Sequence, residues 1–338
     1  MKKLYSIIIV FLCILNTGFI NAQELFTSDS ILNVQLQFPM SEFLESRREA
    51  QEFRGKLVFQ EKDSIHEINV KVSRRGNFRS NAEHCNFYPI RLKINAKQSK
   101  NTIFDGIKKL KLVTHCNSAI EDANDRVIKE FLLYKMYSSI NPYSFKVRLL
   151  RIHYSDTQIQ GSDKEFLAFA IMDDDDLAET FGGKILKVHN IHPGFTADSS
   201  MTLINIFQFM AGNTDWSVKT LHNIELMTKS GSAPIAIPYD FDFSGFVDSP
   251  DAIPAPHLPI TKVRQRYYNG HCQQEYIIQW AINEFYKARP AIYKLMVDYP
   301  MQNIKTQKEN IAYIDDFYKL LSDKEKAKEY FLNHCRKN

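Results

Sequence analysis

Four polar residues in the second half of the chain have the types and the order that phosphoryl transfer requires. Asp215 and Asn223 lie in one turn-rich stretch, and Asp240 and Asp242 follow an apolar run further along. Transfer of a phosphoryl group needs a carboxylate at the acceptor hydroxyl and oxygen ligands for Mg²⁺ at the phosphates. The order therefore predicts Asp215 as the catalytic base and Asn223 with Asp240 as metal ligands. Asp242 is predicted as a further ligand if its segment stays extended, because side chains two apart then share a face.

Simpler explanations exist for each of these residues alone. Asp215 follows Gly212-Asn213-Thr214, and such a turn commonly uses an Asp for local hydrogen bonds. The Asp-Phe-Asp triplet of Asp240 and Asp242 is also compatible with a structural loop or a calcium site. His222 is interpreted as a structural hydrogen-bond donor. The order and spacing of the whole set favour function over these separate explanations.

The first half of the chain has the pattern of β-strands. Apolar and polar residues alternate in several short runs with turn-prone residues between them. The predicted strands are 57–60, 67–73, 88–94, 108–114, 145–154 and 165–172. A run with helical periodicity, 122–139, lies among them, with Asp122 as its expected cap and Pro142 after its end.

The second half has the pattern of helices around a short hairpin. Helices are predicted at 201–210, 273–299 and 303–334. The hairpin, 224–227 with 235–237, is expected to bring Asp215, Asn223 and Asp240 to one edge of a small sheet. A strand-rich first half and a helix-rich second half predict an α+β protein with two lobes, 23–172 and 173–338.

The N-terminus predicts export. Lys2 and Lys3 precede the apolar run Leu4–Leu15, and Ala22 is a small residue at a cleavage position. Residues 1–22 are therefore predicted to be a signal peptide, with an uncleaved anchor as the alternative. We expect a periplasmic or secreted protein without stable membrane insertion. Cleavage removes two lysines and no acid, which lowers the formal charge from +4 to +2. That balance predicts no nucleic-acid partner.

The cysteines agree with export. Cys85, Cys116, Cys272 and Cys335 remain after cleavage, and an even number permits two disulfides. Four cysteines allow three pairings, of which nearness in sequence favours Cys85–Cys116 and Cys272–Cys335. A zinc site is the alternative, but the chain has no CxxC pair.

The polar segments resemble a known kinase family. Asp215, the pair His222-Asn223 and the run Pro238-Tyr239-Asp240-Phe241-Asp242 resemble the catalytic half of CotH-type (spore coat protein H) kinases. A more distant similarity is to HipA-type kinases. In the first half, Arg75-Gly76-Asn77 resembles the Arg-Gly-Asn turn of the CotH-type N-lobe.

The resemblance implies a two-lobed protein-kinase-like fold that uses ATP and Mg²⁺ or Mn²⁺. It also implies a serine or threonine of an exported protein as acceptor. The Arg75-Gly76-Asn77 turn would then approach the phosphates, although it is equally compatible with a structural turn. Lys93 and Lys111 are the candidates on predicted strands for the lysine that contacts the nucleotide.

Two features depart from a conventional kinase. Asn223 follows Asp215 by eight residues, where the usual catalytic loop has five. Met172 stands where the family has an acidic residue. Two alternatives therefore stay open: an inactive pseudokinase that acts as a binding scaffold, and an AMP-transferring enzyme. The chain contains neither GxSxG nor HExxH, which argues against a serine hydrolase or a metalloprotease.

Overall fold

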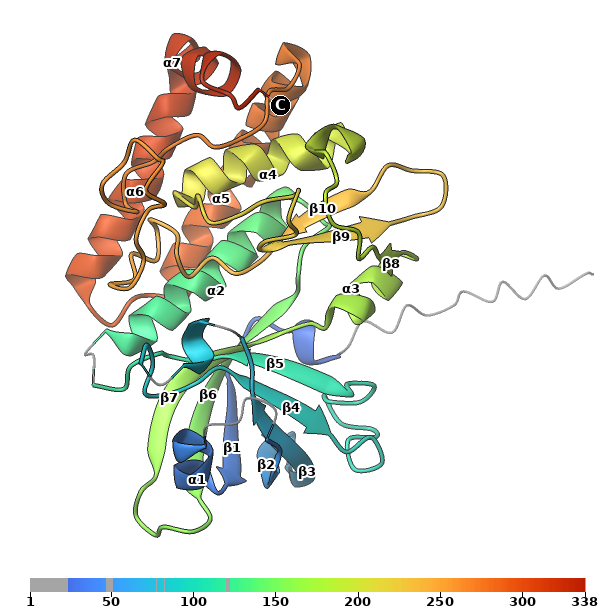
Figure 1. Cartoon of the computed structure of the whole chain (residues 1–338). Coiled ribbons are helices and arrows are strands. Elements are labelled where there is room, and N and C mark those ends of the chain that lie inside the picture. The colour runs from blue at the N-terminus through green and yellow to red at the C-terminus, as the bar shows by residue number, and fades with distance from the viewer. Residues whose placement is uncertain (1–23, 47–50, 77, 82, 120–121, 338) are drawn as a thin grey trace, which may run out of the picture.

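Seven strands in the first half of the chain close into a barrel (Figure 1). The computed structural model describes residues 24–46, 51–76, 78–81, 83–119 and 122–337, so the predicted signal peptide and Asn77 lie outside the described residues. The strands are β1 (Leu32–Phe38), β2 (Phe53–Glu61), β3 (Ser64–Arg74), β4 (Ile90–Ile94), β5 (Lys109–Val113), β6 (Val147–Asp156) and β7 (Lys164–Ile171). Around the barrel their order is β1-β2-β3-β4-β5-β7-β6.

The closed barrel shows that the predicted fold class was wrong. The sequence predicted a two-lobed, protein-kinase-like α+β fold with a strand-rich N-lobe, whereas the structure has a closed mixed barrel, a second small sheet and helices. The cause is β1, a strand that the sequence analysis did not identify. Leu36 of β1 lies opposite Leu57 of the antiparallel neighbour β2 and opposite Tyr154 of the parallel neighbour β6. Because β1 pairs on both sides, neither edge of the sheet is left open.

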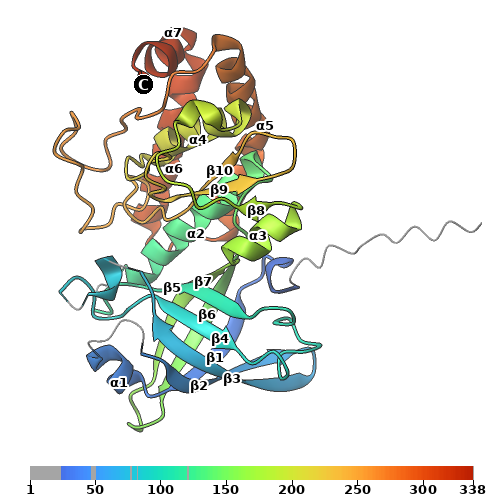
Figure 2. The same ribbon diagram turned by 45° about the vertical axis from the view of Figure 1, so that its right-hand side comes forward.

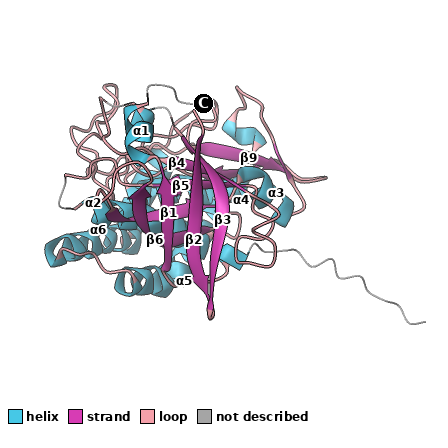
Figure 3. Ribbon diagram, turned by 90° about the horizontal axis from the view of Figure 1, so that it is seen from below, coloured by secondary structure: helices cyan, strands magenta, loops and turns pink. Residues whose placement is uncertain are grey.

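Apolar side chains fill the barrel. Residues on alternate positions of each strand point inward, as Ile90, Leu92 and Ile94 do on β4, and these are buried. They belong to one hydrophobic cluster with the interior residues of the neighbouring strands. Seen from below, the barrel strands lie nearest the viewer and the helices behind them (Figure 3). A barrel of this size is a packed core.

Helices and a second sheet cover one end of the barrel (Figures 1 and 2). The helices at that end are α2 (Ala123–Ile140), α3 (Asp174–Thr180), α4 (Asp198–Ala211), α5 (Glu275–Asp298), α6 (Ile304–Ser322) and α7 (Lys324–Lys328), whereas α1 (Met40–Glu45) lies beside the barrel strands. The sheet has the order β10-β9-β8, from β8 (Lys184–Ile185), β9 (Ile224–Thr228) and β10 (Ile235–Pro238). Helix α2 is buried on nearly all sides, because it lies between the barrel and the other helices.

Most predicted elements are confirmed, with adjusted ends. All six predicted strands and the helix of α2 are present, and β9 and β10 form the predicted antiparallel hairpin. The predicted C-terminal helix is interrupted at Asp323, whose carboxylate accepts a hydrogen bond from the backbone N–H of Lys326 and so begins α7.

Both favoured disulfides are present. Cys85 pairs with Cys116 and Cys272 with Cys335, each with a Cα–Cα distance of 4.8 Å. The first bridge fastens the connection between β3 and β4 to the chain just after β5. Within the described part of the chain, no helix has the length and apolar character needed to cross a membrane. The two disulfides are compatible with a place outside the cytoplasm.

Two glycines hold the two predicted polar segments together. Gly212 ends α4 in the left-handed conformation, with φ of 66°. The N–H of Gly245 donates to the carbonyl of Gly212 over 3.0 Å. A Cβ on Gly245 would lie 2.4 Å from the carbonyl oxygen of Val263 and 2.6 Å from the hydroxyl of Tyr313. The loop before Asp215 can therefore meet the loop after Asp242 only because both positions lack a side chain.

We expect Gly245→Ala to lower the free energy of unfolding by about 1–3 kcal/mol, because the added methyl group must displace backbone. Chemical denaturation of the purified mature protein measures this change. Gly194→Ala is the control, since its nearest new neighbour is the side chain of His192 at 3.1 Å. An equal loss of unfolding free energy in Gly245→Ala and Gly194→Ala would show that the contact at Gly245 is not tight.

Candidate functional site

A cleft lies where the barrel meets α2 and the turn after β10. The barrel contributes the ends of β5 and β7 and the segments that follow β3 and precede β4. Residues from three parts of the sequence therefore meet in one hollow. Its polar lining residues include Arg75, Arg79, Glu130, Tyr134, Tyr239, Asp240 and Asp242, and Gly76 lies beside them.

Three carboxyl groups crowd around one guanidinium in this cleft. Arg79 Nη2 lies 2.8 Å from Asp242 Oδ2, and Arg79 Nη1 lies 3.7 Å from Glu130 Oε2. Asp240 is hydrogen-bonded to Asp242 side chain to side chain. Glu130 is nearly inaccessible, with 4% of its side chain exposed. The cluster therefore sets three acids against Arg79, and Arg75 is a second cation whose charge acts on Glu130.

This crowding makes two of the acids hard to ionise. Burial raises the pKa of Asp240 well above its usual range, and the charges of Asp242 and Glu130 add to the rise. Burial also raises the pKa of Glu130 to about 7, against the opposing effect of Arg79. A cation entering the cleft would relieve the repulsion.

The backbone of this site is held in an uncommon conformation. Asp240 has φ of 59° and Asn223 has φ of 54°, values that few residues other than glycine adopt. The two positions are neighbours, because the N–H of Tyr239 donates to the carbonyl of Asn223 over 3.1 Å. The N–H of Asp240 donates to the hydroxyl of Tyr134 on α2 over 2.8 Å. Such strain persists where surrounding contacts enforce it, and it is frequent at functional sites.

Asp215 forms a second group with His222 and Asn223. His222 Nε2 lies 2.8 Å from Asp215 Oδ1. The side-chain amide of Asn223 donates to the backbone carbonyl of Asp215 over 2.8 Å and to its carboxylate over 3.1 Å. Asp215 remains 40% exposed at its side chain, so one face of the carboxylate is open to an incoming group.

The Asp215 group lies beside the cleft and does not line it. The hydrogen bond that His222 donates to Asp215 raises the pKa of His222, and the charge of Asp242 contributes to the same shift. Asp242 is therefore near enough to His222 for its field to act there. Among the predicted residues, the structure brings Arg75 and Gly76 to Asp240 and Asp242, and it brings Asn223 to Asp215.

Neither candidate lysine lines the cleft. Lys93 points outward from β4 and pairs with Glu52. Lys111 on β5 pairs with Asp174 of α3, with Nζ 2.5 Å from Oδ1.

The acids of the cleft are too few to surround a metal ion completely, but they are enough for a magnesium ion that also binds water and phosphate. In the described ranges, no group of three or more His, Cys, Asp or Glu side chains is arranged to hold a metal ion. Mg²⁺ usually takes only one or two protein carboxylates and completes its shell with water and phosphate oxygens. Asp240 and Asp242 supply such a pair. Asn223 uses its amide N–H groups on Asp215, which leaves only its carbonyl oxygen for a metal.

Sequence reasoning missed Glu130, Arg79 and Tyr134. Glu130 and Tyr134 are four apart on α2 and so share one face. A glutamate within the apolar stripe that contains Val127 and Phe131 was the available signal, because an acid on a buried face needs a partner. Nothing in the sequence pointed to Arg79, because the connection between β3 and β4 that contains it has no regular hydrophobic pattern.

Comparison with known proteins adds no relative. No family model, curated protein or solved structure matches the chain. The resemblance to CotH-type kinases therefore depends on the residues quoted above.

We expect Asp215→Asn to lower the pKa of His222 toward its ordinary value of 6.5, because the charged acceptor is lost. In the native protein the raised pKa favours the folded state at pH below 6.5, and this contribution disappears as the pH rises through the pKa of His222. NMR titration of the ring protons measures the shift, and the ring of His153, which pairs with Asp163, is the internal reference. An unchanged His222 titration would contradict the contact.

We expect Glu130→Gln to flatten the pH dependence of stability in metal-free protein. A carboxyl whose pKa rises from 4.5 to about 7 on folding favours the folded state below pH 4.5, and that contribution is lost as the pH rises through 7. Thermal unfolding at several pH values from 4.5 to 8 tests this. Glu284→Gln is the control, because Glu284 pairs with the exposed Lys287 and does not line the cleft. Parallel curves for the native protein and Glu130→Gln would contradict the assignment.

Proposed function

We propose that this chain is an exported phosphotransferase that moves the γ-phosphoryl group of ATP to a serine or threonine hydroxyl of a protein, with Mg²⁺ or Mn²⁺. One observation carries the proposal. Arg75 and Gly76, predicted to approach phosphates, line the same cleft as Asp240 and Asp242, predicted to hold a metal. These residues come from distant parts of the chain. The proposal concerns the cleft and does not depend on a kinase-like fold.

Each group in the cleft has a task in this reaction. Arg75 supplies a positive charge for phosphate oxygens, and at Gly76 no side chain hinders their approach. Asp240 and Asp242 would hold the metal ion, which when bound neutralises phosphate charge. Ionised Asp240 is disfavoured in the metal-free protein, so metal binding releases a proton.

Asp215 is the base in this proposal. Its exposed carboxylate accepts the proton of the acceptor hydroxyl while the acceptor oxygen bonds to the γ-phosphorus. The bond between that phosphorus and the bridging oxygen breaks, and ADP leaves with the bonding electrons. His222 and Asn223 hold the carboxylate in place through the contacts described above.

A second candidate is a nucleotide-binding protein without transfer activity. Arg79 already forms an ion pair with Asp242. Lys93 and Lys111 form ion pairs with Glu52 and Asp174. A site whose ligand carboxylate is neutralised by an arginine holds a metal weakly. Transfer of AMP from the same cleft is the third candidate, and it differs in the phosphorus atom that is attacked.

We expect ATP with Mg²⁺ or Mn²⁺ to raise the unfolding temperature of the mature protein. Ligand at one hundred times its Kd stabilises by about 2.7 kcal/mol. Asp240→Asn should remove the metal-dependent part of this shift. Asp163→Asn, a change at an exposed ion pair, should leave it intact. Absence of any nucleotide shift in the native protein would rule out all three candidates.

Labelled nucleotide separates the candidates. Transfer of label from the γ-phosphate to protein, lost in Asp215→Asn while the nucleotide shift remains, supports the kinase. Transfer from the α-phosphate supports AMP transfer, and binding without transfer supports the second candidate.

A further inference from the structure

Four basic side chains form a row across the outer face of the barrel. Each lies directly opposite the next in the strand register, with Arg54 opposite Lys71, Lys71 opposite Lys93 and Lys93 opposite Lys109. Opposite residues of antiparallel strands point to the same face, and all four side chains are exposed. Neighbouring strands are about 4.8 Å apart, so the row extends over about 14 Å from β2 to β5.

The row belongs to a wider basic face on the outer side of β2 to β5. Among the described residues, three acids pair with the cations of this face: Glu52 before β2, Glu67 on β3 and Asp174 of α3. The excess of four cations equals the formal charge of the whole chain, +4, so the positive charge is concentrated on this face. The seven cations of the basic face are Arg54, Lys56, Lys71, Arg91, Lys93, Lys109 and Lys111.

The acids of the chain offset only part of the repulsion within the row. Like charges directly opposite each other destabilise a sheet. Glu52 pairs with Lys71 and Lys93, but Arg54 and Lys109 pair with no acid in the described part of the chain. A basic row that lowers the stability of the free protein is relieved when an anionic partner covers it.

Glu52 shows how a carboxylate binds to the row. Its Oε2 lies 2.8 Å from Nζ of Lys71, and its Oε1 contacts Nζ of Lys93. The spacing of adjacent strands thus allows one carboxylate to bridge two cations. Lys71 and Lys93 still have 57% and 49% of their side chains exposed, so carboxylates of another molecule can reach them as well.

The shape of the basic face favours a chain-like partner over a membrane. The face covers four adjacent strands of a closed barrel of seven, so its cations point in different directions. A planar membrane would touch only part of such a surface, whereas a flexible chain can follow it. No Phe, Tyr or Trp occupies an outward position of β2 to β5, which removes the stacking that single-stranded nucleic acids use.

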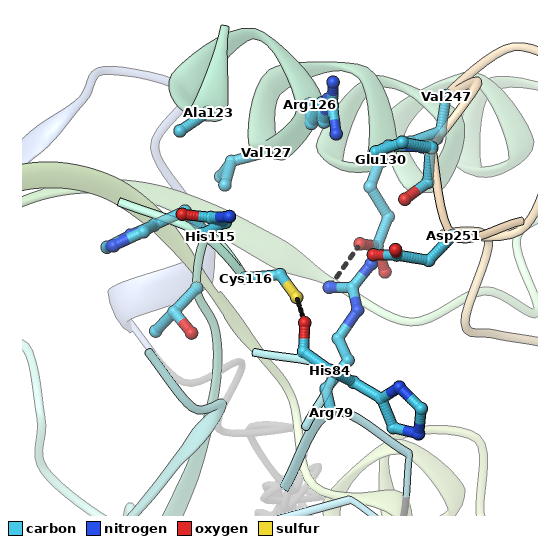
Figure 4. Close-up of a pocket in the computed structure, with 14 residues that line it drawn as sticks. Arg79, His84, His115, Cys116, Ala123, Arg126, Val127, Glu130, Val247 and Asp251 are labelled. Carbon is cyan, nitrogen blue, oxygen red and sulfur yellow. Dashed lines mark hydrogen bonds and ion pairs between the residues drawn. The ribbon is translucent and has the colours of Figure 1, made fainter. Parts of the chain in front are cut away.

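A second cavity, beside the cleft, offers less to a carboxylate (Figure 4). Arg79 and Glu130 line both this cavity and the cleft, and Figure 4 shows them on one side with His115 on the other. Its two guanidinium groups, those of Arg79 and Arg126, already form ion pairs with acids of the chain. Asp251 also lines it and repels anions. The unpaired cations on the outer side of the barrel are therefore the better site for an acidic partner.

We propose that the basic face binds an acidic segment of the acceptor protein. The inference rests on the proposed function in taking the partner to be that acceptor, and it names the feature that selects it. The face begins at the cleft, because Pro89 and Val113 line the cleft and the opposed pair Arg91 and Lys111 lies two residues beyond them. An acidic chain that follows the face therefore leads toward the cleft.

Fluorescence anisotropy with nucleotide-free mature protein tests the proposal. The probe is a labelled peptide of about eight residues with alternating glutamate and serine, long enough to cross the row when extended. The control peptide has glutamine in place of glutamate. An oligogalacturonate with the same number of carboxylates and vesicles of phosphatidylcholine with phosphatidylglycerol represent the other anions.

We expect saturable binding of the glutamate peptide that weakens as salt is added, because the contacts are exposed ion pairs. Binding of the glutamine peptide, the oligogalacturonate and the vesicles should be weaker. Equal binding of the glutamine peptide, or no binding of the glutamate peptide, would overturn the proposal. Equal or tighter binding of the oligogalacturonate or the vesicles would overturn the choice of a protein partner.

A double variant separates this face from the overall charge of the protein. Arg54→Gln with Lys109→Gln should weaken binding of the glutamate peptide about three- to tenfold, the effect of two exposed ion pairs. The unfolding temperature should stay equal or rise, because repulsion within the row is relieved. Lys308→Gln with Lys324→Gln is the matched control, since it removes the same charge from exposed positions of α6 and α7. Unchanged affinity in the first variant, or an equal loss in both, would contradict the assignment.

Peptide binding is measured without nucleotide, and the nucleotide shift is measured without peptide. Peptide binding without a nucleotide shift would support the basic face and remove the proposed phosphotransfer. A nucleotide shift without peptide binding would do the reverse, so the two proposals fail separately.

Discussion

The pairing of Arg79 with Asp242 and Glu130 joins parts of the chain that otherwise meet through few polar contacts. Arg79 comes from the connection between two barrel strands, Glu130 from the buried helix α2, and Asp242 from the turn after β10. Removing one member of a buried ion pair costs about 3–5 kcal/mol, because the remaining charge loses its partner. The geometry of both cavities therefore depends on this guanidinium.

Departures from local rules occur at the site and also elsewhere in the described part of the chain. Asp240 and Asn223 adopt left-handed backbone, and so do Lys62 and Asn101, which do not line the cleft. The interior of the barrel, by contrast, is apolar. The left-handed backbone of Asp240 and Asn223 therefore agrees with a functional site but does not by itself identify one.

The sequence predicted the parts of the fold that depend on local pattern. Alternation located the strands and the hairpin that carries Asp240, and cysteine spacing gave both disulfides. Barrel closure could not be predicted in this way, because it depends on β1 pairing with β6, far along the chain. Alternation with apolar residues placed Lys93 on a strand with its side chain toward solvent, and the structure has it exposed on β4 and paired with Glu52.

The two cavities are electrostatically coupled through their shared wall. A cation that binds Asp242 competes with Arg79 for that carboxylate, and the pairing of Arg79 with Glu130 then matters more. Any change at Glu130 alters the cavity that contains His115, because Glu130 lines both spaces. Linkage requires the effect to be reciprocal, so a group bound beside His115 must change the affinity of the cleft for a cation by the same factor. The ion pair of Arg79 and Glu130 therefore borders both hollows.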